Sequence, residues 1–470
     1  MVLFTHYTPH DTNTATLTQD LPPPPPTSEE PEYHVLYTSM NTLNDDVLLN
    51  IFTHYRLIAK SSWKPQFGWY TLPHVCPRWR YLVYESAFHL DVHILCTEGA
   101  PVADMLSLLP PLPLVIDYQS KSIDYQPKII RARDDLEISH ALRLHHRVRS
   151  VVLRVPPSRL QNLLVLMDKP FPILEHLSIS STANECSSLI LPNALLAPKL
   201  RHLNLHDVNI SSKLSLLTST VSLVTFTLEN VQDSGHFLPK NLILPLQSFR
   251  NLEELSVGFS MPLPYPGADN EFLDAPETPV TLPQLKSFTF CGVSSRLESL
   301  VAQIRAPLLE RLNIALSLQI VFASSHLSHF INTIEGLNIS IEKITLGFNF
   351  SGRALCLQFG DQPSIFSFWM CGVLDLQFEC ASQICNALRP LLCCVEQLTL
   401  LWMSRGCDNG DTVRAIWRGL LRHFIGVKSL HIHSPGVLYR AIVDSLELRD
   451  AGLDTGLLPS LQEISHDPSE

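Results

Sequence analysis

The chain has 470 residues, which is too many for one compact core, so we expect either several domains or one elongated repeat array. Hydrophobic residues make up 45% and charged residues 17%, which excludes a generally disordered protein. The net charge of −11 argues against a nucleic-acid-binding surface as the main role.

Targeting and redox features favour a location inside the cell. The N-terminus lacks the basic and apolar regions of a secretory signal, and no apolar run approaches the roughly 20 residues of a membrane span. The 11 cysteines are an odd number without the spacing of a small disulfide framework. We therefore expect reduced, buried thiols in a cytoplasmic or nuclear protein without a membrane partner.

Residues 1–40 are expected to form a disordered, proline-rich tail. They contain polar Thr, Asn and Asp runs and five consecutive prolines, Pro22–Pro26, which favour a polyproline helix. Such a segment is either a ligand for an SH3 or WW domain or a stiff spacer, and the spacer is favoured.

Residues 41–90 predict a unit of two or three helices. Asn44 or Asp45 can cap the first helix, and Pro77 fits the first turn of the second. Because such a small unit buries little apolar surface, we expect it to need a partner. The apolar positions of the two helices are Leu48, Ile51, Phe52 and Tyr55 in the first, and Val75, Trp79, Leu82 and Val83 in the second.

These residues resemble an F-box, whose pattern begins Leu-Pro-x-Glu, continues to Ile-Phe and ends Val-Cys-x-x-Trp-Arg. The chain reads Leu-Asn-Asp-Asp at 43–46, Ile-Phe at 51–52 and Val-Cys-Pro-Arg-Trp-Arg at 75–80, so Asn44 and Asp46 depart from the pattern. The 60–71 connection is also longer than usual.

The resemblance implies binding to the Skp adaptor and, through it, to the cullin and RING subunits of a ubiquitin ligase. Some of the implied residues, such as Leu48 and Trp79, can instead pack the core of the unit. The residues implied in adaptor binding or its support are Leu43, Asp46, Val47, Leu48, Ile51, Phe52, Val75, Cys76 and Trp79.

Residues 91–139 are expected to form the first units of a solenoid, with a strand at 91–96, a helix at 104–110 and a strand at 111–118. The stretch from 40 to 180 resembles a large class of fungal F-box proteins.

From residue 140 to 470 an apolar pattern recurs at intervals of 23–34 residues and predicts stacked strand-and-helix units. Its last four positions alternate, which indicates a short strand. The clearest copies are at 172–179, 198–205, 251–257, 283–290 and 307–314, and looser ones begin at Val148, Leu223, Ile341, Cys371, Val395, Val427 and Leu461.

Helices are expected between these strands, at 158–167, 294–304 and 411–426. The second has a capping box in Ser295 and Glu298, and the third has Asp411 as a cap and Gly426 as a stop. The repeats resemble irregular leucine-rich repeats. The expected fold is α/β: a short all-helical F-box followed by a curved parallel-strand and helix solenoid. A generic α/β domain is the alternative.

Sequence motifs give no reason to expect catalysis. The chain lacks the nucleophile-elbow, P-loop and dinucleotide-binding patterns. His431 and His433 share one strand face but have no third ligand at a characteristic spacing, and buried thiols are favoured for the adjacent Cys393 and Cys394. We therefore expect no enzyme activity, cofactor or metal.

Binding is the better prospect, because solenoids expose extended concave surfaces. The expected function is that of a substrate receptor of a ubiquitin ligase, and the alternative is an interaction scaffold whose F-box-like segment is only a cap. The expected substrate is a protein, bound by the outward-pointing strand residues His176, His202, Asn204, Glu254, Thr289, Arg311, Lys343 and His431.

Overall fold

The computed structural model describes most of the chain from residue 42 onward. The described residues are 42–60, 65–119, 132–182, 189–209, 215–231, 239–259, 279–316, 325–334, 342–349, 354–360, 366–371, 381–386, 388–402, 417–433, 436–446 and 457–467. The predicted tail at 1–40 and the predicted cap Asp411 lie outside them.

The first elements are helical and form what we call the helical module, residues 42–90. It contains α1 (Asp45–Lys60), the 3₁₀ helix η2 (Pro65–His74) and α2 (Pro77–Glu85). Pro77 lies in the first turn of α2, as the sequence predicts, and Cys76 before it is the N-cap. Val75, however, precedes α2 and is 60% exposed, so its assignment to the apolar face of that helix is wrong.

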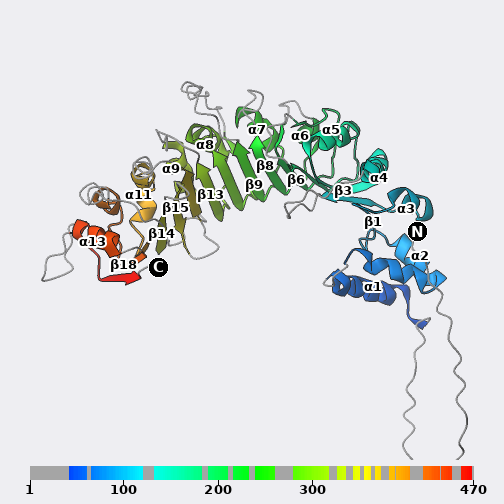
Figure 1. Ribbon diagram of the computed structural model, residues 1–470, viewed down its shortest axis with the longest axis horizontal. Coiled ribbons are helices and arrows are strands. Elements are labelled where there is room, and N and C mark those ends of the chain that lie inside the picture. The colour runs from blue at the N-terminus through cyan, green and yellow to red at the C-terminus, as the bar shows by residue number, and fades with distance from the viewer. Residues whose placement is uncertain are drawn as a thin grey trace, which may run out of the picture.

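The rest of the described chain is built on one sheet of 15 strands that curves into an arc (Figure 1). Most neighbouring strands are parallel. In order across the sheet the strands are β1 (Ile94–Thr97), β2 (Leu114–Gln119), β3 (Val148–Val155), β4 (His176–Ser181), β6 (His202–His206), β8 (Thr225–Val231), β9 (Glu254–Phe259), β11 (Ser287–Gly292), β13 (Arg311–Leu316), β16 (Phe366–Cys371), β15 (Ala354–Phe359), β14 (Lys343–Asn349), β17 (Gln397–Trp402), β18 (Ser429–His433) and β19 (Glu463–Asp467).

Helices lie on the outer side of this arc, and the strands form its inner side (Figure 1). Two short pairs, β5 (Leu189–Ile190) with β7 (Val208–Asn209) and β10 (Val280–Thr281) with β12 (Ile304–Arg305), complete the strands. The helices that the structure gives with bounds are α3 (Val102–Leu108), α4 (Ala132–Arg143), α5 (Pro157–Val165), α6 (Ser215–Ser219), α7 (Pro239–Leu246), α8 (Ser294–Val301), α9 (Ser325–Asn332), α11 (Arg389–Leu392) and α13 (Gly436–Ser445), and residues 381–386 and 417–421 are also helical.

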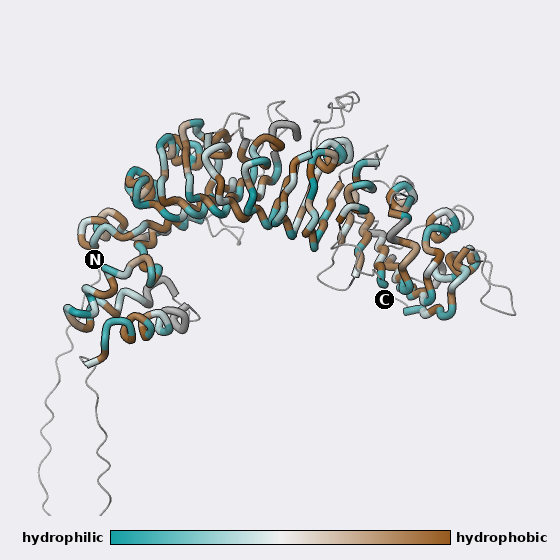
Figure 2. Tube along the Cα trace, turned by 180° about the vertical axis from the view of Figure 1, so that it is seen from behind, coloured by the Kyte–Doolittle hydropathy of each residue, from teal (hydrophilic) through white to brown (hydrophobic). Residues whose placement is uncertain are grey.

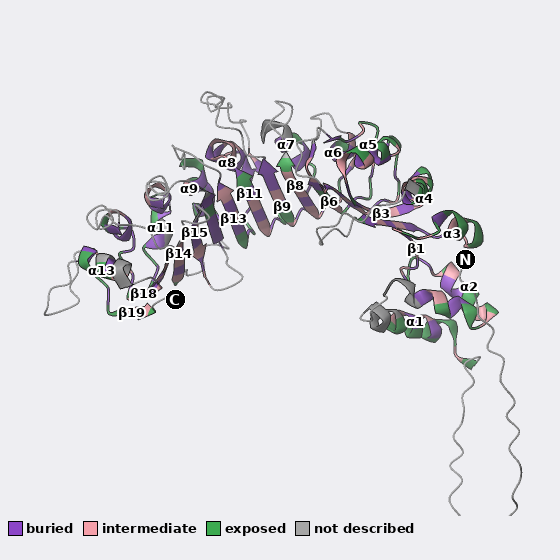
Figure 3. Cartoon of the chain, in the orientation of Figure 1, coloured by how far each residue is buried: buried purple, intermediate pink, exposed green. Residues whose placement is uncertain are grey.

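Alternation along each strand creates the core between sheet and helices. In β4 the buried residues Leu177 and Ile179 alternate with partly exposed ones, and Phe288 and Phe290 do the same in β11. The hydropathy colouring alternates along the strands in the same way, as does the burial colouring (Figures 2 and 3). Large apolar residues at every second position therefore fix which face of each strand meets the helices.

One part of the sheet departs from the predicted parallel order. β14 is not beside β13: β16 pairs with β13 in parallel, and β15 lies antiparallel between β16 and β14. Only residues 350–353 separate β14 from β15, and so short a connection suits an antiparallel pair, whereas a parallel pair needs a longer crossover. The fold is thus a mixed α/β architecture with a sheet that is predominantly, but not entirely, parallel.

The antiparallel strand β15 was not predicted, because the looser repeat copy after Ile341 was placed at Cys371. Cys371 is the last residue of β16, and the strand expected after it lies outside the described residues. By contrast, the five clearest copies each end in a strand of the sheet, namely β4, β6, β9, β11 and β13.

The predicted capping box of the helix at 294–304 is also wrong. Val293 is the N-cap of α8, and no side chain caps that end. The buried Glu298 instead accepts hydrogen bonds from the backbone N–H groups of His326 (2.7 Å) and Leu327 (2.9 Å). Its carboxylate therefore caps the neighbouring helix α9, which begins at Ser325.

The cysteines whose side chains the structure describes are free thiols, but they are not all buried. Cys96 and Cys385 are buried, whereas Cys291, Cys393 and Cys394 are exposed, so the prediction of buried thiols is wrong for these three. Within the described residues, no helix has both the length and the apolar character needed to cross a membrane.

Candidate functional site

Helix α1 carries two apolar stripes that face different surroundings. Leu48 and Phe52 are fully buried, at 0% and 1% exposure, and we call them the inner stripe. Val47, Ile51 and Tyr55 are spaced four residues apart, lie on one side of the helix and are 41%, 38% and 40% exposed. We call these three the outer stripe. The sequence predicted one apolar face, and the structure divides it in two.

The inner stripe holds the helical module together. The ring of Phe52 meets the indole of Trp79 edge to face, with ring centroids 4.7 Å apart. Leu43 is partly buried and packs against the same core. Leu48, Phe52 and Trp79, which the sequence offered as adaptor-binding or supporting residues, therefore face the interior of the module.

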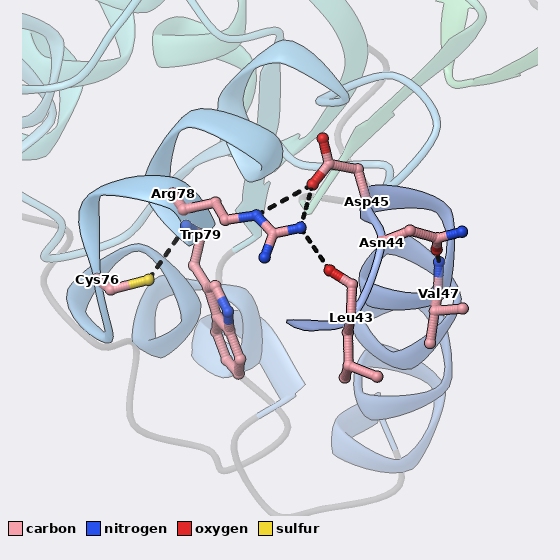
Figure 4. Close-up of polar contacts among 7 residues, drawn as sticks. All are labelled: Leu43, Asn44, Asp45, Val47, Cys76, Arg78 and Trp79. Atoms are coloured by element: carbon pink, nitrogen blue, oxygen red, sulfur yellow. Dashed lines mark hydrogen bonds and ion pairs between the residues drawn. The ribbon is translucent and has the colours of Figure 1, made fainter. Parts of the chain in front are cut away.

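Polar contacts fix the start of α1 against the start of α2 (Figure 4). The Arg78 guanidinium donates to the Asp45 carboxylate at 2.6 Å and to the backbone carbonyl of Leu43 at 2.6 Å. Asn44 accepts the backbone N–H of Val47 at 2.8 Å and so caps α1. The asparagine that departs from the F-box pattern thus provides the helix cap.

The remaining predicted adaptor residues lie around this junction. Asp46 is exposed in the first turn of α1, and Val75 is exposed between η2 and α2. The Cys76 sulfur accepts the backbone N–H of Trp79 at 3.5 Å, which gives Cys76 a capping role. Val47, Ile51, Asp46 and Val75 therefore remain accessible to a partner.

The helical module also approaches the first strand of the sheet through η2. Tyr70 stacks on Trp69, with ring centroids 3.9 Å apart, and burial raises the pKa of Tyr70 to about 12. The nearby Cys96 thiolate raises that pKa further, whereas the backbone hydrogen bond of Leu95 in β1 lowers it. The module is thus in contact with the end of the sheet at which β1 lies.

The second candidate surface is the inner face of the sheet, where paired strands align side chains in rows. The first inner row runs along the early residues of the strands, and His176, His202, Glu254, Arg311 and Lys343 lie in it. The second inner row lies two residues further along each strand and contains Asn204, Thr289 and His431. All eight residues predicted for substrate binding therefore point to one face.

Histidines of the first inner row are paired with hydroxyl groups. His176 Nδ1 lies 3.2 Å from Ser150 Oγ, His202 Nδ1 lies 3.0 Å from Thr225 Oγ1, and the two imidazole centroids are 6.1 Å apart. Burial, and then the neighbouring His202, lower the pKa of His176 below its ordinary value of 6.5. His176 is therefore mainly neutral at pH 7.

A third inner row, two residues further on, contains a surface that the sequence reasoning missed. Trp369 of β16 is 44% exposed there. A detectable signal was present, because Phe366, Phe368 and Met370 alternate with it as in the other strands. From β11 to β17 this row reads Cys291, Ala315, Trp369, Cys356, Gly347 and Leu401.

The histidine pair near the last strand has structural partners. His431 Nδ1 lies 2.5 Å from Ser465 Oγ, and His433 Nδ1 lies 3.3 Å from the Asp467 carboxylate. A search of the described residues for three or more His, Cys, Asp or Glu side chains placed to hold a metal ion finds none.

Comparison with known proteins adds no assignment to these two surfaces. No model of a protein family matches the chain, and a search among curated proteins gives no match.

Proposed function

We propose that the protein is a substrate receptor of a Skp–cullin–RING ubiquitin ligase, in which the helical module is an F-box. The observation that carries the proposal is the outer stripe of α1, Val47, Ile51 and Tyr55, which stays exposed while Leu48 and Phe52 on the same helix are buried in the core of the module. Exposed apolar rows on a helix are a common basis for docking a partner.

The motif of the F-box supports the same proposal from the sequence. Cys76, Trp79 and Arg78 each have a structural use: a helix cap, a core contact and a link between two helix starts. Asn44 caps α1, so its departure from the F-box proline leaves the start of the helix well formed. The Val-Cys-x-x-Trp-Arg ending is therefore compatible with a module of this kind.

In this function the protein acts without chemistry of its own. The module binds the adaptor, and the inner face of the sheet holds a protein substrate close to the ubiquitin-loaded enzyme of the complex. The gain is in effective concentration and orientation. Such a receptor would work in the cytoplasm or nucleus.

The alternative is an interaction scaffold whose helical module only caps the sheet. The contact of Tyr70 with Leu95 favours this alternative, because it places the module against the strand at the end of the sheet. A cap, however, needs apolar side chains only where it meets the solenoid. In the outer stripe, Tyr55 shares a hydrogen bond with Thr71 of η2 at 3.2 Å, but such a cap does not require the exposed apolar surfaces of Val47 and Ile51.

The test is co-expression of the full-length chain with the Skp adaptor, followed by size-exclusion chromatography. We expect co-elution for the wild-type protein and for Leu244→Ala, a change at an exposed apolar residue of α7. The double variant Val47→Asp with Ile51→Asp should elute without the adaptor, because two carboxylates would be buried in an apolar interface. Absence of co-elution for the wild type would leave the scaffold as the better description.

A further inference from the structure

The third inner row contains an apolar surface centred on Trp369, which is 44% exposed and does not belong to the core formed by the described residues. In the described residues, Trp369 is flanked across the strands by Ala315 and Cys356, with Gly347 one strand further. These small side chains leave the indole standing above its neighbours. Burial raises the pKa of the Cys356 thiol to about 12, which agrees with apolar surroundings.

The second inner row beside this surface offers hydrogen-bonding groups without charge. Ser367 donates to the Asn313 side-chain oxygen at 2.7 Å, and Thr289, Gln358 and Thr345 continue the row. From β11 to β17 neither the second nor the third inner row contains Asp, Glu, Lys or Arg.

The other half of the inner face has a different character. Its corresponding rows contain Asp117, Arg154 and Glu229, and His206 lies 2.7 Å from the Asp207 carboxylate. In the second and third inner rows, the charged residues therefore lie in the strands before β9 and, at Asp467, in β19, whereas Glu254, Arg311 and Lys343 lie in the first inner row. A phosphate or carboxylate placed over Trp369 would lose hydration without gaining a counter-charge in these rows.

We propose that the Trp369 surface binds an extended, uncharged and unphosphorylated segment of the substrate protein, with one aromatic or large aliphatic side chain packed against the indole. Tryptophan is among the residues that most often dominate binding energy at interfaces. Strands lie about 4.8 Å apart, so the six residues of the third inner row span about 24 Å, the length of about seven extended residues. The inference rests on the proposed function only in naming the bound segment as the substrate's.

Binding of synthetic peptide pools to the full-length protein tests this inference. Each pool contains nine-residue peptides with blocked ends, random uncharged flanks and one fixed central residue: Phe, Leu, Ala, Asp, Lys or phosphoserine. Retention on immobilised protein is quantified by mass spectrometry. We expect the Phe and Leu pools to be retained about tenfold more than the Asp, Lys and phosphoserine pools.

Variants identify the surface that is responsible. Trp369→Ala should abolish the preference and Trp369→Phe should keep much of it, because a ring remains. Ala315→Glu should also abolish it by placing a carboxylate beside an intact indole, and Leu244→Ala, on the outer side, should change nothing. Thermal unfolding of each variant shows whether the fold is retained, which the exposure of Trp369 leads us to expect.

Three results would overturn the inference: preference for a charged pool, equal retention of all pools, or full retention by Trp369→Ala. Adaptor co-elution is measured on the same preparations. Wild-type protein that binds the adaptor but shows no pool preference contradicts only the Trp369 site. Protein that shows the preference but does not bind the adaptor contradicts only the ligase assignment.

Discussion

The two stripes of α1 predict that stability and adaptor binding can be changed separately. Phe52 is 1% exposed and its ring packs on Trp79, so Phe52→Ala should destabilise the helical module by about 3–5 kcal/mol. Ile51 is 38% exposed, so Ile51→Asp loses less packing and adds a small helix-propensity cost. We expect it to destabilise the module by only about 1 kcal/mol.

Adaptor affinity should respond in the opposite order: Ile51→Asp should weaken binding directly, whereas Phe52→Ala should act only through the stability of the module. If Ile51 lies in the interface, loss of its side chain removes about 2 kcal/mol, and an unpaired carboxylate adds at least another 1 kcal/mol. A loss of about 3 kcal/mol corresponds to more than a hundredfold weaker binding. Phe52→Ala should weaken binding only as far as it unfolds the module.

Hydrogen exchange of the full-length protein, read over residues 45–85, measures local stability, and titration with the adaptor measures affinity. The reasoning would be refuted if Ile51→Asp accelerated exchange as much as Phe52→Ala does. It would also be refuted if Ile51→Asp left affinity unchanged while the module stayed protected. Simultaneous replacement of Ile51 and Phe52 could not separate these cases, because Phe52 belongs to the core.

The remaining predictions concern the solenoid. Glu298→Ala should lower the free energy of local opening at the start of α9 by about 2 kcal/mol, because two backbone donors lose a buried acceptor. Hydrogen exchange there should therefore become faster, and protection equal to that of the wild type would contradict this. Gly426→Ala should destabilise the protein by about 1–3 kcal/mol and lower its thermal unfolding midpoint, because the new methyl group would overlap the backbone carbonyl of Cys393. The matched control is Gly419→Ala, which has open space around it and should not lower the midpoint. His176 has a lowered pKa in the folded state, so the unfolded chain binds its proton more readily and stability should rise with pH up to about 7. His176→Asn should flatten that rise in urea unfolding, and an unchanged slope would rule the imidazole out.

Much of the solenoid could be predicted because its repeats are locally complete. A strand such as His176–Ser181 contains its own alternation, so the position of Leu177 and Ile179 in the core follows from the sequence alone. The same alternation predicted that His176, His202 and Asn204 would share the opposite face. Rows form across strands because neighbouring copies pair at the same repeat position.

Order within the sheet could not be predicted, because it depends on partners far apart in sequence. Nothing in the pattern at 366–371 indicates that β16, and not β14, pairs with β13. The outward position of Trp369 could have been found from the alternation of Phe366, Phe368 and Met370, but its neighbours Ala315 and Cys356 follow only from the strand order. Glu298 is a similar case: three residues after Ser295 it matches a local cap, but its carboxylate binds the start of the next helix.

The division of α1 into two stripes shows why the proposed adaptor residues could not be separated from core residues by the sequence. Residues 47, 48, 51, 52 and 55 fall within one broad apolar arc of a helix, and helical periodicity cannot tell which edge of that arc meets the core. The edge is set by Trp79, which lies on another helix and packs against Phe52. The packing of Phe52 on Trp79 buries one edge of the arc and leaves Val47, Ile51 and Tyr55 exposed. This exposure arises only when α1 and α2 pack together, and the proposed docking depends on it.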